Sequence, residues 1–457
     1  MPLGVGASLV NATCIAVTGL LGVLLLALPR RLAAIPLLLG AAYVSRDAVV
    51  EIGPANFTAV RILVAVGVLR ILLRGERPAG GLDGVDRLVL LWALLLLGSS
   101  AFHRPGTWIF RAGLVWSDLG SYILLRVFIR DAADVRRIFR FVCVALVPVA
   151  ILMLLEKVYM DNFFAALGRI TDVATRAGHV RARGPFAHPI LAGTVGATCF
   201  GMAVALWRRD RRYALSGLAA AAGMVYAATS TGPVLMATFI VAALCLWKLR
   251  GHVRQIRWLA VVGILALDLV MHDPVYFIID RIDISGGSQG WFRARLIQSA
   301  FEHLDEWWLV GTDYTRHWMA TGITANEAST DITNHVLQMG VYGGLGLMIT
   351  FVLILVLSFR NAGRAARSRA LGRDARFAAW ALGSILFGHV MNLLSITLFD
   401  QSIVFFYLVL ACISALQTRA QVRRAKPAAA GASVAPGGQP VRVGAPGLAA
   451  ATMMAER

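Results

Sequence analysis

The sequence predicts an all-α polytopic membrane protein with about 13 transmembrane helices, within a range of about 12 to 14. Three observations support this class. Of the 457 residues, 58% are hydrophobic and only 15% are charged. The apolar residues form repeated runs of about 20 residues, the length that crosses a bilayer as a helix. Basic residues gather in alternate connections between these runs, a pattern that sets the orientation of membrane proteins.

The predicted spans follow one another closely, and the second is the shortest. They cover residues 8–28, 32–46, 57–73, 86–102, 107–129, 138–156, 189–207, 213–229, 233–249, 257–272, 335–358, 377–396 and 398–416.

The basic connections all fall on one side of these spans, which we assign as cytoplasmic. They are Arg30-Arg31, Arg136-Arg137 with Arg140, Arg208 to Arg212, Lys248 to Arg257, and Arg360 to Arg376. The opposite, periplasmic side then receives a smaller loop, 157–188, and one large loop, 273–334. A transmembrane domain thus occupies residues 1–418. The remaining residues, 419–457, are rich in Ala, Gly, Pro and Val without periodicity, which predicts a disordered cytoplasmic tail.

The formal net charge of +19 raises nucleic acid as a partner. The short connections between spans hold most of the basic residues, so orientation in the membrane explains the charge and no nucleic-acid partner is expected. The five cysteines all fall inside predicted spans, which argues against disulfides and cysteine metal sites. We expect neither a metal nor a cofactor.

The large loop contains a predicted amphipathic helix from Phe292 to Trp308, which Gly311 ends. Arg293 falls in the middle of its apolar face, whereas Arg295 falls on the polar face. A charge that points into an apolar surface requires a partner. That partner is either an acid of the protein, such as Asp280 or Asp283, or an anionic ligand.

The smaller loop ends in the run Arg181-Ala-Arg183-Gly-Pro-Phe-Ala-His188-Pro. Two arginines beside a rigid Gly-Pro turn can clamp an anion, because a guanidinium presents paired donors to phosphate oxygens. The alternative is that both are ordinary solvated loop arginines.

His335, beside Asn334, lies at the mouth of the eleventh span. A histidine at a membrane boundary can act as a general base on a hydroxyl group, because its pKa lies near working pH. Its competitors for this role are His188, His303 and His317. For other polar residues near or inside spans, we expect interfacial or structural roles; these are Glu156, Asp268 and His389.

Three stretches resemble the bacterial O-antigen ligase and polymerase family of the WaaL/Wzy type. Arg181-Ala-Arg-Gly-Pro-Phe-Ala-His-Pro resembles the family's Arg-x-x-Gly-x-Phe-x-x-Pro at the start of a span. Gly290-Trp-Phe-Arg, the helix after it and Leu309-Val-Gly-Thr-Asp resemble its Arg, helix and Leu-Leu-Gly-x-Gly segment. Thr333-Asn-His-Val-Leu-Gln with Gly343-Gly-Leu-Gly resembles its His-Asn-x-x-Leu-Gln and Gly-x-x-Gly segment, although Thr333 stands where the family has its histidine.

The resemblance implies a GT-C-like membrane glycosyltransferase in the bacterial inner membrane, with its active site facing the periplasm. Its donor would be a glycan on undecaprenyl diphosphate, and its acceptor another glycan or lipid A core, as in lipopolysaccharide or exopolysaccharide synthesis. The implied catalytic residues are Arg181, Arg293 and His335, and the implied substrate-binding residues are Arg183, His188 and Asn334. No metal is required, since fixed arginines supply the charge.

Three alternatives stay open. Ligase and polymerase differ only in the acceptor, and no residue distinguishes them. A transporter or flippase of lipid-linked glycan would place charges near the middle of the bilayer. A family member that has lost catalysis would account for the displaced histidine.

Overall fold

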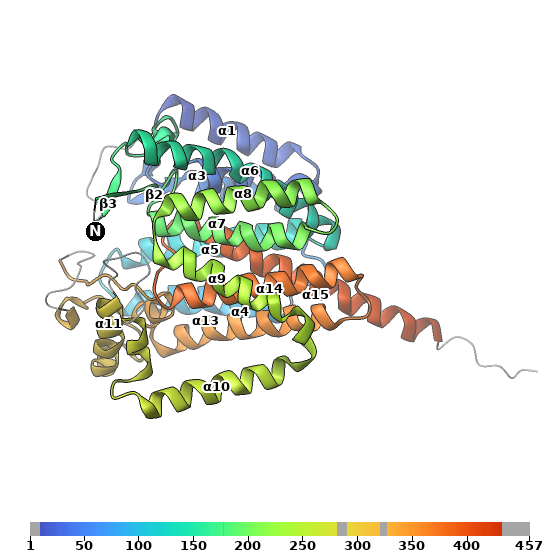
Figure 1. Ribbon diagram of the computed structural model, residues 1–457. Coiled ribbons are helices and arrows are strands. Elements are labelled where there is room, and N and C mark those ends of the chain that lie inside the picture. Colours follow the sequence, from blue (N-terminus) through green and yellow to red (C-terminus); the bar gives the residue numbers. More distant parts are fainter. Residues whose placement is uncertain (1–9, 177, 281–289, 320–326, 432–457) are drawn as a thin grey trace, which may run out of the picture.

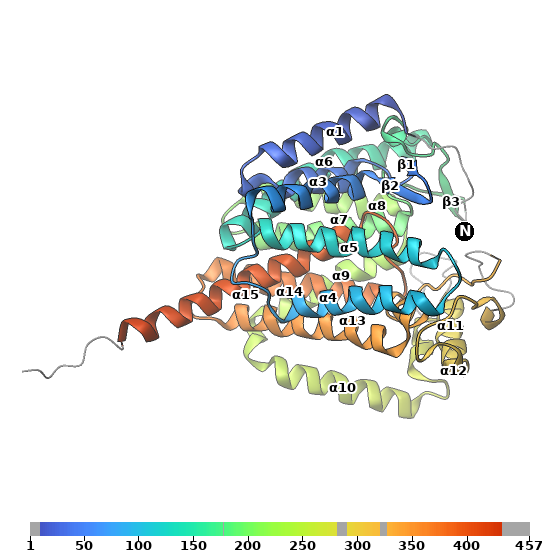
Figure 2. The same cartoon turned by 180° about the vertical axis from the view of Figure 1, so that it is seen from behind.

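The computed structural model describes residues 10–176, 178–280, 290–319 and 327–431, the last thirteen by their backbone only. Within these ranges the chain is mostly helical, with two short β-hairpins (Figures 1 and 2). The α-helices are α1 (Ala12–Ala27), α2 (Ala34–Tyr43), α3 (Ala59–Arg74), α4 (Gly84–Ser99), α5 (Thr107–Phe128), α6 (Ala132–Tyr159), α7 (Pro189–Leu206), α8 (Arg211–Ala228), α9 (Thr231–Cys245), α10 (Val253–Val270), α11 (Gly290–Glu302), α12 (Leu304–Trp307), α13 (His335–Arg367), α14 (Arg373–Leu393) and α15 (Ile403–Gly431).

Short 3₁₀ turns and strands fill several connections. The 3₁₀ turns are η1 (Arg30–Leu32), η2 (Ser100–Phe102), η3 (Phe163–Leu167), η4 (Leu246–His252), η5 (Val275–Ile279) and η6 (Arg316–Met319). The hairpins pair β1 (Val49–Ile52) with β2 (Ala55–Thr58), and β3 (Ala174–Arg176) with β4 (His179–Arg181), both antiparallel.

Each predicted span contains one of the longer helices. In the part of the chain that the structure describes, five segments are long and apolar enough to cross a membrane: Gly84–Phe102, Ala132–Tyr159, Pro189–Leu206, Thr231–Val270 and His335–Arg367. Helix α2 has 10 residues, which is about 15 Å at 1.5 Å per residue, half the thickness of a hydrocarbon core. The last helix continues to Gly431, so the segment predicted to be disordered from residue 419 begins as helix. Alanine, arginine and glutamine, which favour helix, dominate that continuation; residues 432–457 lie outside the described ranges.

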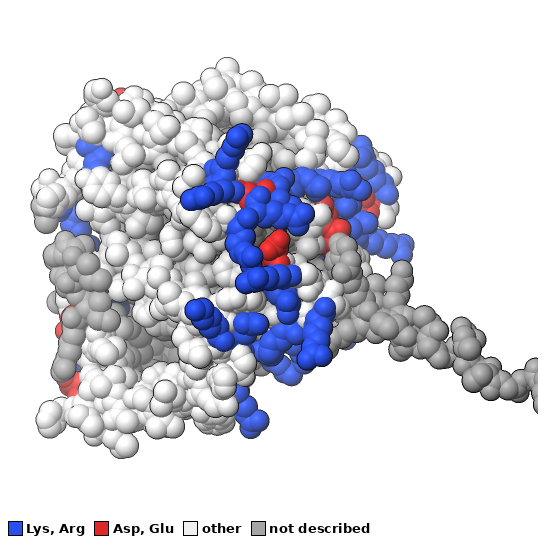
Figure 3. Space-filling view, turned by 45° about the vertical axis from the view of Figure 1, so that its right-hand side comes forward, with Lys and Arg blue, Asp and Glu red and all other residues white. Residues whose placement is uncertain are grey.

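The long helices run back and forth between two ends of the bundle (Figures 1 and 2). Both hairpins, α11 and α12 lie at one end, here called the loop end. The C-terminal part of α15 leaves from the other, the basic end, where lysines and arginines gather (Figure 3). At the basic end Asp210 forms ion pairs with Arg136 and Arg140. Hydrogen bonds from Arg136 lower the pKa of Asp210 to about 2, against the effect of burial.

Helix α10 lies apart from the rest of the bundle (Figures 1 and 2). None of its residues is buried, and Leu269 is 87% exposed. An apolar helix that packs on no other part of the protein is not stable in water and needs an apolar surrounding such as lipid. This arrangement is what a lipid-facing helix requires.

The predicted helix Phe292–Trp308 is present but is interrupted at His303, which separates α11 from α12. The side chains of His303 and Trp307 bond to the carbonyls of Ser299 and Ala300, both at 2.8 Å, in place of the next helical turn. The regular spacing of the helix faces therefore does not continue from α11 into α12. Phe301, Leu304 and Trp308 fall on the apolar face of the predicted helix but are exposed, and Ser299 falls on its polar face but is buried.

Helix α12 ends at Trp307, and Gly311, with φ +88°, closes the turn after it by donating from N to Trp307 O at 3.1 Å. The segment around Gly311 docks on α13. Leu345 N donates to Trp308 O at 2.8 Å, and Thr312 N donates to Val341 O at 2.9 Å. The contact is possible because α13 is kinked at Gly344, which has φ +76°. A Cβ at this glycine would lie 2.2 Å from the backbone oxygen of Leu309.

Candidate functional site

A rigid turn carries Arg183 and Gly184 at the loop end. The Glu156 carboxylate accepts hydrogen bonds from both backbone N–H groups, at 3.0 and 2.8 Å. Asn162 Nδ2 donates to Gly184 O at 3.0 Å. Glu156 is therefore a buried support of the turn, a more specific role than the interfacial one expected for it.

The link between α14 and α15 holds the same turn from the other side. Gln401 Nε2 donates to Pro185 O, and Asp400 Oδ2 accepts from Ala187 N, both at 2.8 Å. Because these hydrogen bonds fix the backbone of the turn, its side chains take defined positions at little further cost in conformational entropy.

The two arginines of the turn differ in their partners. Arg183 forms an ion pair with Asp172 and also donates to the Asp172 carbonyl at 2.5 Å. Arg181 is 8% exposed, and its Nε is buried without a hydrogen-bond partner among the described residues. Burial lowers the pKa of Arg181, and the charges of Arg176 and Arg293 lower it further. The charge of Arg183 is thus neutralised by Asp172, whereas the charge of Arg181 is available to a ligand.

Arg293 reaches this region from α11. Its Nε donates to Ser395 O at 2.8 Å. Burial lowers its pKa and the charge of Arg176 adds to that effect, whereas Asp331 opposes it. Of the two acids proposed from sequence as its partner, Asp280 forms no ion pair with it among the described residues, and Asp283 lies outside those residues. Arg295 is exposed and donates to Gln298 Oε1 at 2.9 Å, so the two arginines face opposite surroundings, as helix periodicity predicts.

Arg176, Arg181 and Arg293 form what we call the arginine cluster. No carboxylate oxygen of the described residues lies within 4.0 Å of their guanidinium nitrogens. Like charges held together in a partly buried place are costly, and an anion removes that cost. The sequence analysis does not identify Arg176 as a site residue, because a single basic residue in a short strand has no recognisable pattern around it.

His188 faces the arginine cluster and caps α7. Its Nδ1 accepts a hydrogen bond from Ile190 N at 3.1 Å. Burial lowers its pKa to about 3, together with the charges of Arg181, Arg183, Arg176 and Arg293. The ring is therefore neutral with its proton on Nε2, which makes it a hydrogen-bond donor for an anion.

Asn334 and His335 start α13. The Asn334 side chain caps the helix by accepting from Leu337 N at 3.0 Å, which gives it a structural task besides the predicted contact with substrate. His335 is 5% exposed, its Nδ1 has no described partner, and its ring packs edge-on against Phe351 at 5.2 Å.

His335 lines a cavity of about 170 Å³, separate from the arginine cluster. Arg61 and Asp118 are among its polar walls, with Arg61 Nε donating to Ser117 Oγ at 3.1 Å. Sequence reasoning missed both, although an acid inside a predicted span, such as Asp118, is a recognised signal of function.

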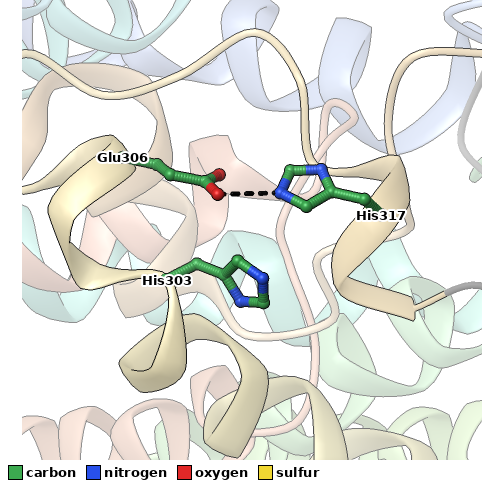
Figure 4. Close-up of side chains that lie close together, drawn as sticks. All are labelled: His303, Glu306 and His317. Atoms are coloured by element: carbon green, nitrogen blue, oxygen red, sulfur yellow. Dashed lines mark hydrogen bonds and ion pairs between the residues drawn. The ribbon is translucent and has the colours of Figure 1, made fainter.

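His303 and His317, the other histidines considered as bases, lie together at a third place with Glu306 (Figure 4). Neither of them lines the cavity beside His335.

No known protein-family model and no curated protein matches this chain, so a functional assignment rests on its own residues and geometry.

Proposed function

We propose that the protein is a membrane glycosyltransferase that transfers or polymerises a glycan carried on undecaprenyl diphosphate. The observation that carries the proposal is the meeting of Arg181 and Arg293, from two separate loops, in a cluster of cations that has no carboxylate partner among the described residues. Such a cluster suits a diphosphate, whose oxygens accept the paired donors of guanidinium groups.

In the proposed reaction an acceptor hydroxyl oxygen attacks the anomeric carbon of the donor sugar. The bond between that carbon and the diphosphate oxygen breaks, and the diphosphate leaves with the electron pair. Negative charge on the leaving group grows in the transition state, where fixed cations are most effective. Arg181 and Arg293 would stabilise this charge, with Arg176 and the Nε2–H of His188 as further donors.

The acceptor's proton has to move to a base. His335 suits this role, since its Nδ1 has no hydrogen-bond partner among the described residues and its ring lines the cavity. In this scheme the cavity takes the acceptor and the arginine cluster takes the donor, with residues 395–401 between them.

The proposal places the protein in a bacterial inner membrane, with the helices of the thirteen predicted spans embedded in it, and a GT-C-like arrangement. The basic end would face the cytoplasm by the positive-inside rule, and the loop end the periplasm. A reporter fused after Arg419 tests this orientation; periplasmic activity of that reporter would contradict it.

A flippase of lipid-linked glycan is the second candidate. Arg61 and Asp118 favour it, because both lie within apolar helices and line a cavity, as charged residues of transport pathways do.

The two candidates differ in whether a new glycosidic bond forms. Purified protein in detergent micelles, which have no compartments, should convert a lipid-linked donor and an acceptor into a longer or transferred glycan. No product with either kind of acceptor, together with translocation in vesicles, would instead establish a flippase. In a deletion strain, loss of long chains would indicate a polymerase, and free polymer that fails to reach its acceptor would indicate a ligase.

A further inference from the structure

Three side chains of the large loop converge away from the arginine cluster: His303, Glu306 and His317. One ligand atom from each lies within 4.8 Å of the other two (Figure 4). His317 Nε2 lies 2.8 Å from Glu306 Oε1. His303 follows α11, Glu306 belongs to α12 and His317 to η6, so the group joins three elements.

Hydrogen bonds from outside the group fix two of these side chains. His303 Nδ1 lies 2.8 Å from Ser299 O; a carbonyl has no proton to give, so Nδ1 carries the proton and Nε2 keeps a free lone pair. Trp318 Nε1 donates to Glu306 Oε2 at 3.0 Å, which leaves Oε1 for a ligand. Partners of this kind orient histidine and carboxylate ligands in metal sites.

The charge at the group also suits a cation. A glutamate carboxylate is an anion at neutral pH, and its two partners here are imidazoles, which are metal ligands when neutral.

We propose that His303, Glu306 and His317 bind one Zn²⁺ ion. Two imidazole nitrogens and one carboxylate oxygen match the ligand preferences of zinc, with water in the fourth tetrahedral position. Bonds of about 2.0–2.2 Å separate tetrahedral ligand atoms by about 3.3 Å. The His317 and Glu306 atoms, 2.8 Å apart, therefore have to separate slightly, and the His303 atom has to approach them by at most about 1.5 Å. The ion would take the place of the proton between His317 Nε2 and Glu306 Oε1.

The ion would cross-link two parts of the large loop. It joins the end of α11 to η6 across the break at His303, and α11 carries Arg293. Zinc here would therefore stabilise the folded large loop without touching the arginine cluster, which revises the expectation that no metal is bound.

Metal binding by the full chain tests the proposal. The protein is purified in detergent without a polyhistidine tag, stripped with chelator and dialysed, then titrated with ZnCl₂ or CoCl₂ alone. We expect one Zn²⁺ per chain, a higher Tm on binding, and the visible absorption of four-coordinate Co²⁺. His317→Ala and Glu306→Gln should each weaken binding by about tenfold or more.

Two matched variants control for general effects: His272→Ala, an exposed histidine before η5, and Glu302→Gln, an exposed acid at the end of α11. Both should bind zinc as the unmodified protein does. Glu306→Gln keeps the shape of the side chain, so it decides the matter should His317→Ala fail to fold. Less than one ion per chain at micromolar zinc, or equal affinity in Glu306→Gln and Glu302→Gln, would overturn the proposal.

Discussion

Arg293 donates a hydrogen bond of 2.8 Å from Nε to the backbone oxygen of Ser395. The bond ties the large loop to the link between α14 and α15, and the same link holds the smaller loop through Gln401 and Pro185. One backbone segment thus positions both arginine-bearing loops. The four donors of the Arg293 Nη groups have no acceptor among the described residues, which leaves them for an anion.

The kink at Gly344 gives a prediction about the attachment of the large loop. Alanine there has to adopt a left-handed conformation, at a cost of about 1–3 kcal/mol, and its Cβ meets the oxygen of Leu309 at 2.2 Å. Gly344→Ala should therefore lower Tm and speed proteolysis within the loop. Gly346→Ala is the control, since nothing lies within 4 Å of its Cβ position. Equal loop cleavage in the two variants would show that the backbone contact does not hold the loop.

The lowered pKa of His188 gives a prediction about pH. Its pKa is about 3 in the folded protein against an ordinary 6.5, so below pH 6.5 the unfolded chain takes up a proton that the folded chain refuses. Stability from this group is full above pH 6.5 and falls as pH drops toward 3. One pKa unit is about 1.4 kcal/mol, so the loss by pH 5 is up to about 2 kcal/mol.

His188→Asn separates this effect from other titrating groups, because asparagine also caps a helix. Unfolding of both proteins in detergent at pH 5 and pH 7.5 is the measurement. The variant should lose less stability than the unmodified protein over this range. An identical loss in both would mean that His188 is not held neutral by burial and the arginines.

Local patterns in the sequence account for the helices and for the opposite surroundings of Arg293 and Arg295, since periodicity alone sets these. Other features depend on contacts between distant segments. The break at His303 arises from side-chain bonds to Ser299 and Ala300, and the large loop docks on a kink at Gly344. No residue near Arg176 signals that the hairpin brings it to Arg181 and Arg293.

His335 is predicted to be the base that receives the acceptor's proton. His335→Ala should abolish product while the protein still accumulates in the membrane. His335→Phe tests the role more sharply, because it keeps an aromatic ring against Phe351 but cannot accept a proton. Product from the phenylalanine variant would reduce His335 to a packing role. Asp118, in the same cavity, would then be the next candidate, since His188 Nδ1 is occupied by Ile190 N.

The central claim is that Arg293 contacts the diphosphate of the donor, and its neighbour Arg295 provides the control. Both arginines lie on α11, so a change in net charge or helix propensity affects them alike. Arg293 is half-buried and bonded to Ser395, whereas Arg295 is exposed beside Gln298. An exposed polar contact of the second kind is worth at most about 1 kcal/mol.

The decisive measurement is glycan product on a gel from strains that express each variant at matched membrane level. Arg293→Ala should give no product and Arg295→Ala should give close to the normal amount. Arg293→Lys should also be impaired, because an ammonium group lacks the two-donor fork. An inactive Arg295→Ala beside an active Arg293→Ala would contradict both the position of Arg293 in the site and its proposed role.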